Sequence, residues 1–204
     1  SFVLSLHHTP ARWSFSATAT PIPCLRRILE RLLADGYRFV DLAECGPAGP
    51  KAGSIVVTVD DGYESNARHL APFLRELGIP WTVFVLAGAM GRANAWDLPL
   101  AGARERHLTE DEIARLGEEG VTIGAHGMTH RDFRLLGDAA LDQELRRSRE
   151  VLERLAKRPV DTLAYPRGGV DERVARRARG AGFRLGFGSA RAPELPGDLG
   201  PLSL

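Results

Sequence analysis

The sequence contains little cysteine: Cys24 and Cys45 are the only two in 204 residues. They stand in unlike contexts and form no Cys-x-x-Cys pair, so the sequence predicts neither a disulfide framework nor a thiolate metal site. We expect a buried free thiol at both positions.

Long apolar runs and an excess of either charge are also missing. No stretch approaches the ~18 to 20 apolar residues that a membrane-spanning helix needs. The 27 Lys and Arg nearly balance the 26 Asp and Glu, so bulk charge predicts neither a nucleic-acid nor a membrane partner. With 44% hydrophobic and 26% charged residues, we expect one soluble globular domain over residues 1–204. The chain enters a strand-like run directly after Ser1, without an initiator Met or signal peptide, which favours a trimmed or processed chain.

Strand-like and helix-like segments alternate along most of the chain, usually with a glycine between helix and next strand. We expect strands over 2–6, 37–42, 56–59, 81–86, 121–125, 162–164 and 183–187. Helices are expected over 25–33, 70–77, 109–119, 138–155 and 171–179, with a capping box at Thr109–Glu112 and an Asp138 cap. Parallel strands joined by crossover helices form an α/β fold. A barrel of about seven units fits, and periodicity leaves a doubly wound open sheet as the alternative.

Two adjacent carboxylates, Asp60 and Asp61, end the apolar run Val56–Val59 and precede Gly62. Neighbouring acids repel, and a carboxylate at the rim of a core is unfavourable unless a cation or hydrogen-bond donors meet it. The pair therefore indicates a site. Asp61 can bind a metal while Asp60 accepts a proton from water.

The segment 124–130 places His126 and His130 four residues apart, just after another expected strand. If the segment turns through one helical pitch, both imidazoles can share a metal with one carboxylate. Such a nitrogen and oxygen ligand set suits Zn²⁺, and Co²⁺, Ni²⁺ or Fe²⁺ also fit. The carboxyl ends of parallel strands lie on one face of a barrel, so His7, Asp60, Asp61 and the two histidines should converge.

Four segments resemble motifs of the polysaccharide deacetylases, the NodB-homology or carbohydrate esterase family 4 group. Thr58–Gly62 resembles the family's T-F-D-D-G, and His126–His130 resembles its H-[S/T]-x-x-H. Ala164–Gly168 looks like the Tyr-Pro-x-Gly form of the third motif, and Ala181–Phe183 is similar to a later Ala-Gly-aromatic step. The resemblance runs from about residue 2 to residue 190.

The resemblance implies a distorted (β/α)7 barrel that removes N-acetyl, sometimes O-acetyl, groups from an acetylated glycan with one divalent metal. It implies Asp60 as the base, Asp61, His126 and His130 as ligands, and the backbone N–H of Arg167 as an oxyanion donor. Tyr165 and Pro166 would contact substrate. Trp96 lies in an expected loop over 87–107, where its indole could stack on a sugar ring.

The chain departs from the family pattern at three points. Gly127 replaces the usual Ser or Thr after the first ligand, Ala164 stands where many members carry an Arg that pairs with the base, and no histidine follows His130 to act as general acid. Leu4–His8 resembles the N-terminal Leu-x-Tyr-His of the poly-N-acetylglucosamine deacetylase subgroup, so we expect His7 to be the acid. Strand alternation should send His8 to the opposite side.

Three alternatives stay open from the sequence. The protein could be a carbohydrate-binding relative without turnover, or a metal hydrolase of another amide, ester or phosphate. His7 could instead be a hydrogen-bonded residue at a strand end. By analogy with the family we expect an extracytoplasmic location. His69 and His107 fall outside every motif, and the sequence does not indicate the oligomeric state.

Overall fold

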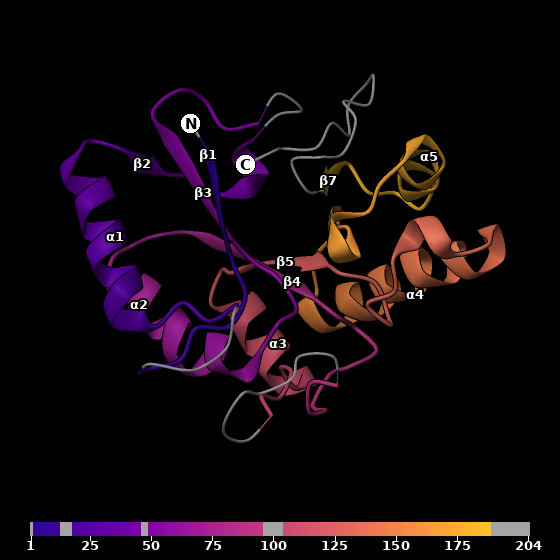
Figure 1. Cartoon of the computed structure of the whole chain (residues 1–204), viewed down its shortest axis with the longest axis horizontal. Helices are drawn as coiled ribbons and strands as arrows, with labels where there is room; N and C mark the ends of the chain where they lie inside the picture. The colour runs from indigo at the N-terminus through magenta and orange to yellow at the C-terminus, as the bar shows by residue number, and fades with distance from the viewer. Residues whose placement is uncertain (1, 13–17, 46–48, 96–103, 189–204) are drawn as a thin grey trace.

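A computed structural model describes residues 2–12, 18–45, 49–95 and 104–188 (Figure 1). Its strands are β1 (Phe2–Leu6), β2 (Arg38–Phe39), β3 (Ser54–Val59), β4 (Trp81–Val85), β5 (Thr122–Ala125), β6 (Thr162–Ala164) and β7 (Leu185–Phe187). Its α-helices are α1 (Ile22–Ala34), α2 (Ala71–Glu76), α3 (Glu110–Glu118), α4 (Asp138–Ala156) and α5 (Glu172–Gly180). Trp96, the predicted sugar-stacking residue, lies outside the described residues.

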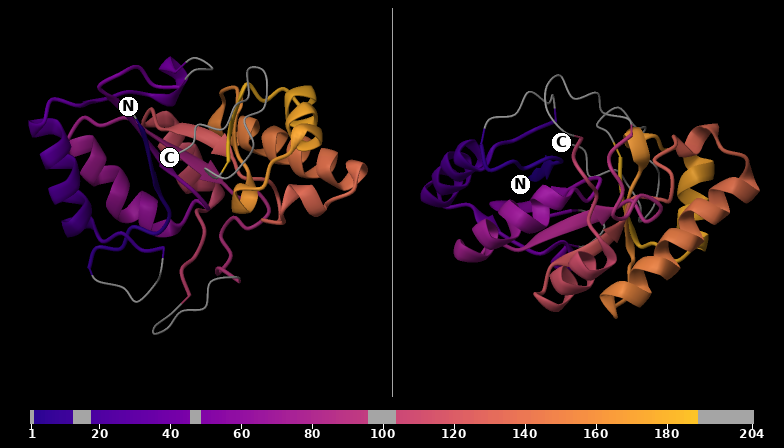
Figure 2. Two further views of the ribbon diagram at one scale, coloured as in Figure 1. Left: turned by 45° about the horizontal axis from the view of Figure 1, so that its top comes forward. Right: turned by 90° about the horizontal axis from the view of Figure 1, so that it is seen from below.

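All strand pairs are parallel, in the order β1-β3-β4-β5-β6-β7, and β2 pairs with the first residues of β3. The sheet is curled, and Figure 2 shows the helices along one side of it. This arrangement confirms the predicted barrel-like α/β fold over the doubly wound alternative. Because every strand runs the same way, the residues that follow the strands gather at one edge.

Side chains pack on both faces of the sheet, as expected for parallel strands. Val57 and Val59 join the core beneath the helices, whereas Val56 joins a smaller cluster that includes Phe84 and Cys45. Cys45 is therefore the buried thiol that the sequence predicts, but Cys24 is only half-buried.

The helix predictions need three corrections. In α1, Leu25 and Leu29 are buried, but Ile28 and Leu33 are 46% and 40% exposed because they lie at the two edges of the apolar stripe. Asp138 does not cap α4: the helix begins at Asp138 after Gly137, and the Asp138 carboxylate pairs with arginines of α5. The expected helix 70–77 is a π-helical turn, Asn66–Leu70, followed by the short α2.

Two strands are shorter than predicted by two residues or more, and one helix start is confirmed. The expected strand 37–42 contains only β2, after which a 3₁₀ turn begins at Leu42. The last strand begins at Leu185 because the Phe183 amide still bonds the Ala178 carbonyl at the end of α5. Thr109 and Glu112 form the predicted reciprocal capping box. In the described part of the chain, no helix is long and apolar enough to cross a membrane.

Candidate metal centre

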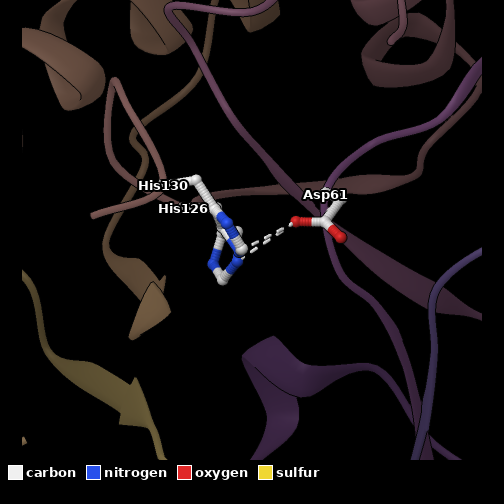
Figure 3. A group of neighbouring side chains, drawn as sticks. All are labelled: Asp61, His126 and His130. Atoms are coloured by element: carbon white, nitrogen blue, oxygen red, sulfur yellow. Dashed lines mark ion pairs between the residues drawn. The ribbon is translucent and has the colours of Figure 1, made fainter. Parts of the chain in front are cut away.

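Asp61, His126 and His130 meet at the carboxyl edge of the sheet (Figure 3). Asp61 follows β3 by two residues, and His126 directly follows β5. One ligand atom from each side chain lies within 4.8 Å of the others, so the structure brings these three of the predicted site residues together. Asp61 and His126 are buried, and the His130 side chain is 14% exposed.

The spacing of the three side chains fits a single metal ion. The Asp61 Oδ1 atom lies 3.4 Å from Nε2 of His126 and 3.3 Å from Nε2 of His130. Ligands about 2.0 to 2.1 Å from a tetrahedral ion are separated by roughly 3.3 to 3.4 Å. Asp61 Oδ1 is also buried without a hydrogen-bond partner, which is unfavourable unless a cation meets it. The donor set and this orphaned oxygen therefore fit a divalent metal.

The His126 ring is oriented by the backbone of the neighbouring strand. Its Nδ1 atom lies 2.8 Å from the carbonyl oxygen of Ala164. A carbonyl can only accept, so Nδ1 carries the proton and donates, and the neutral ring keeps its Nε2 lone pair for a metal. Ala164, which replaces the family's arginine, thus contributes a backbone atom to the site.

The charges of the ligands are coupled. Burial favours a higher pKa for Asp61, but the imidazoles of His126 and His130 outweigh it and hold the pKa well below its ordinary value. Burial lowers the pKa of His126, but the two carboxylates outweigh it and raise the pKa overall. Asp61 is therefore ionised at neutral pH, as a metal ligand must be.

Backbone strain is concentrated at the site. In the described ranges, four residues other than glycine have a positive φ, and three of them are Asp61 (66°), His130 (57°) and Arg167 (59°). This left-handed conformation is uncommon for residues with a Cβ and persists only where the surrounding structure enforces it. Its recurrence at predicted site residues supports a functional reason for the shape of these turns.

Asp60 lies beside the three candidate metal ligands, and its carboxylate is partly exposed. Its side chain is 22% exposed, and its Oδ2 atom is 3.9 Å from Nε2 of His7. Burial raises the pKa of Asp60 and Asp61 adds to the rise, while His126 and His7 oppose it. A raised pKa makes a carboxylate a stronger proton acceptor. The His7 side chain is 38% exposed.

The turn between the two histidine ligands is braced by Glu144 of α4, a residue that the sequence analysis missed. Its carboxylate accepts from the amides of Met128 (2.6 Å) and Thr129 (3.1 Å) and from the Thr129 hydroxyl (2.5 Å). A Cβ on Gly127, where φ is 78°, would lie 2.9 Å from that carboxylate. Gly127 therefore makes room for a brace that replaces the missing Ser or Thr hydroxyl.

The third motif is placed differently from the prediction. Tyr165 is 3% exposed, stacks edge-on against Phe133 and lies against Gly186, so its side chain belongs to the core and not to a glycan surface. Pro166 is also buried. Arg167 projects an exposed side chain from a left-handed backbone.

Two further histidines have partners that the sequence analysis did not find. His8 has a different partner from His7: its Nε2 lies 2.8 Å from the Glu105 carboxylate, whereas His7 lies near Asp60. His107, which falls outside every motif, contacts the backbone carbonyl of Asp61 through Nδ1 at 2.9 Å. The one available signal was that His107 ends a long connection, where functional residues often lie.

The comparisons with known proteins agree with the motifs. Poly-beta-1,6-N-acetyl-D-glucosamine N-deacetylase of Staphylococcus aureus (strain MSSA476) is 27% identical over 138 residues, which cover 66% of this chain and 47% of that protein. The chain spans about half the length of the first curated relatives it matches: the matched segments cover 45% of one relative and 47% of the other.

Solved structures share the fold. IcaB from Ammonifex degensii has a TM-score of 0.78 at 23% identity, over 100% of this chain and 91% of that one. The Streptococcus pyogenes deacetylase PplD in complex with acetate has a TM-score of 0.74 at 16% identity, over 92% of this chain and 82% of that one. The family model for polysaccharide deacetylase matches residues 48–186, which is more than half of the chain. The chain therefore belongs to the polysaccharide deacetylase family.

Proposed function

We propose that this protein is a metal-dependent deacetylase that removes N-acetyl, or O-acetyl, groups from a poly- or oligosaccharide. The observation that carries the proposal is the arrangement of Asp61, His126 and His130 within 4.8 Å, beside the partly exposed carboxylate of Asp60. A binding module has no need of a spare carboxylate next to a ligand set, whereas a hydrolase needs a base there.

Asp61, His126 and His130 would hold one divalent metal, and we propose Zn²⁺ because two imidazoles and one carboxylate suit it; Co²⁺, Ni²⁺ and Fe²⁺ are the competing ions. When bound, the ion supplies Lewis acidity toward water and toward the acetyl carbonyl. The Nδ1 contact of His126 with Ala164 and the Glu144 brace support this set by fixing ligand directions.

The other residues would move protons and stabilise charge. Asp60 takes the proton of the attacking water, a role supported by its raised pKa. His7 gives a proton to the departing sugar nitrogen, a role supported by its position 3.9 Å from Asp60. The backbone N–H of Arg167 would donate to the carbonyl oxygen as negative charge develops, a contribution typically worth about 10² to 10³ in rate.

We propose an acetylated amino-sugar polymer as the substrate, by analogy with the N-deacetylase relative named above. Such polymers belong to cell envelopes and extracellular matrices, so the same proposal places the protein outside the cytoplasm. Trp96, outside the described residues, remains our proposed sugar-stacking residue.

Acetate release is the direct test. Oligomers of N-acetylglucosamine with β-1,6 and β-1,4 linkages, and a small acetate ester, are incubated with wild-type protein, with chelated protein, and with chelated protein given Zn²⁺ or Co²⁺. We expect release that disappears on chelation and returns with metal, and a loss of about 10² to 10⁴ in Asp60→Asn. Full activity in chelator would reject the mechanism. Saccharide binding without any acetate release, unchanged in Asp60→Asn, would favour the binding module.

A further inference from the structure

We propose that His107 is a positioning residue that sets the direction of the Asp61 carboxylate through the Asp61 backbone. The inference rests on the proposed role of Asp61 as a metal ligand. It assigns a role to a buried histidine that belongs to none of the family motifs and lies 46 residues away from Asp61 in sequence.

The contact between the two residues is a hydrogen bond with a fixed direction. Nδ1 of His107 lies 2.9 Å from the carbonyl oxygen of Asp61. Because the carbonyl oxygen can only accept, Nδ1 carries a proton and donates. The His107 side chain is 2% exposed, so water does not readily replace this donor.

The bond acts on a residue whose backbone needs support. Asp61 adopts a φ of 66°, in the left-handed region. There the direction of the peptide carbonyl and that of the Cα–Cβ bond are set together, so a donor that holds the carbonyl also aims the carboxylate at His126 and His130. Residues that hydrogen-bond to metal-ligating residues, without contacting the metal, fix the orientation of those ligands.

The His107 ring is itself held in place. It stacks on Tyr63 with ring centroids 4.9 Å apart and planes inclined by 26°, and Tyr63 is 1% exposed. The Tyr63 hydroxyl accepts a hydrogen bond from the Asn94 side-chain amide at 2.8 Å. The backbones of Tyr63 and His107 also form an antiparallel bridge, and the Leu108 amide bonds the Gly62 carbonyl at 2.8 Å.

Together these contacts tie the connection between β4 and α3 to the turn that presents Asp61. The turn after β3 carries the Asp61 carboxylate, and the connection between β4 and α3 carries His107, whose Nδ1 donates to the Asp61 backbone carbonyl. Packing against Tyr63 does not by itself call for a ring nitrogen at this position, because Phe would fill the same space. The contact of Nδ1 with the backbone carbonyl of a ligand residue therefore favours an orienting role.

Two matched variants separate the donor from the packing. His107→Phe keeps the aromatic stack on Tyr63 and removes the donor. His107→Asn loses the stack but keeps a side-chain N–H at the same number of bonds from the backbone as Nδ1. His69→Phe, in the π-helical turn Asn66–Leu70, controls for the loss of an imidazole.

The measurements are Zn²⁺ affinity, by competition with a chromogenic chelator, and the melting temperature of metal-free protein. We expect His107→Phe to bind Zn²⁺ about 10- to 100-fold more weakly than wild type, the usual effect of losing such a partner. His107→Asn should stay within about threefold of wild type although it melts at a lower temperature.

Two outcomes would overturn the inference. Equal Zn²⁺ affinity in His107→Phe and wild type would show that the bond does not direct Asp61. An affinity loss that follows the melting temperature, greatest in His107→Asn, would show a packing role only. If wild-type protein itself binds no Zn²⁺, the proposed function fails, and that result is distinct from both.

Discussion

Nδ1 of His126 lies 2.8 Å from the backbone carbonyl oxygen of Ala164, so a ligand at the end of β5 is oriented by the last residue of β6. Sheet pairing sets this distance, since Ala125 is in register with Leu163. The metal site and the sheet are therefore coupled: binding at the ligands should stabilise the fold, and the effect should be measurable as a change in melting temperature.

Zn²⁺ should raise the melting temperature of wild-type protein. At a free concentration of 100 times Kd, binding to the native state adds about 2.7 kcal/mol. For a domain of this size that corresponds to a rise of roughly 5 to 10 °C. Differential scanning fluorimetry with buffered Zn²⁺ measures it. His126→Ala should lose the rise, and an equal rise in that variant would place the metal elsewhere.

His7→Gln should slow deacetylation in a way that depends on the leaving group. An amine must be protonated as it departs, so loss of the acid should lower kcat by about 10² to 10⁴ on N-acetylated sugar oligomers. A phenolate leaves without a proton, so p-nitrophenyl acetate should be cleaved at nearly the wild-type rate. Equal losses on both substrates would contradict an acid role for His7.

Glu144→Leu should weaken the turn between the histidine ligands. The substitution leaves the amides of the half-buried Met128 and the exposed Thr129 without their acceptor, and a typical intramolecular hydrogen bond contributes about 0.5 to 1.5 kcal/mol. Urea unfolding of metal-free protein measures the loss. Glu144→Gln, whose carbonyl oxygen can still accept, is the matched control and should lose less; equal losses would show that the acceptor is unimportant.

Glu105 should make stability depend on pH in the acid range. Burial favours a higher pKa for Glu105, but the contact with His8 and the Ser65 amide outweigh it and lower the pKa below its ordinary 4.5. A lowered folded pKa adds stability that is present above about pH 4.5 and is lost as the pH falls through the folded value.

Melting temperatures of wild type and Glu105→Gln, measured in chelator from about pH 6 to pH 3, test this. Wild type should melt higher near pH 6, and the difference should shrink as the pH falls. A difference that stays constant across the range would mean that ionisation of Glu105 does not contribute.

The sequence predicts the part of the site that follows from strand order. Asp60, Asp61 and His126 come directly after buried parallel strands, and parallel strands bring their carboxyl ends together whatever the loops do. The left-handed turns at Asp61 and His130 are not predictable in this way, because neither residue is a glycine.

The supporting residues could not be predicted, because their contacts join distant segments. His107 reaches Asp61 across 46 residues, and Glu144 reaches Thr129 from a different element. The burial of Tyr165 could not be predicted either, since it also depends on distant residues. The motif suggests a substrate contact, but the Tyr165 side chain is buried against Phe133 and Gly186. The exposed Ile28 on α1 likewise depends on how closely the helix approaches the sheet.

The left-handed backbone at Asp61 has a consequence for how this family changes over time. Glycine accepts that conformation far more readily than aspartate does, and it adds no negative charge next to Asp60. A descendant released from the need for turnover would gain stability from glycine at this position. We therefore expect sequences that have drifted into pure sugar binding to reveal themselves first by Gly at position 61, in proteins that withstand heat better than their active ancestors.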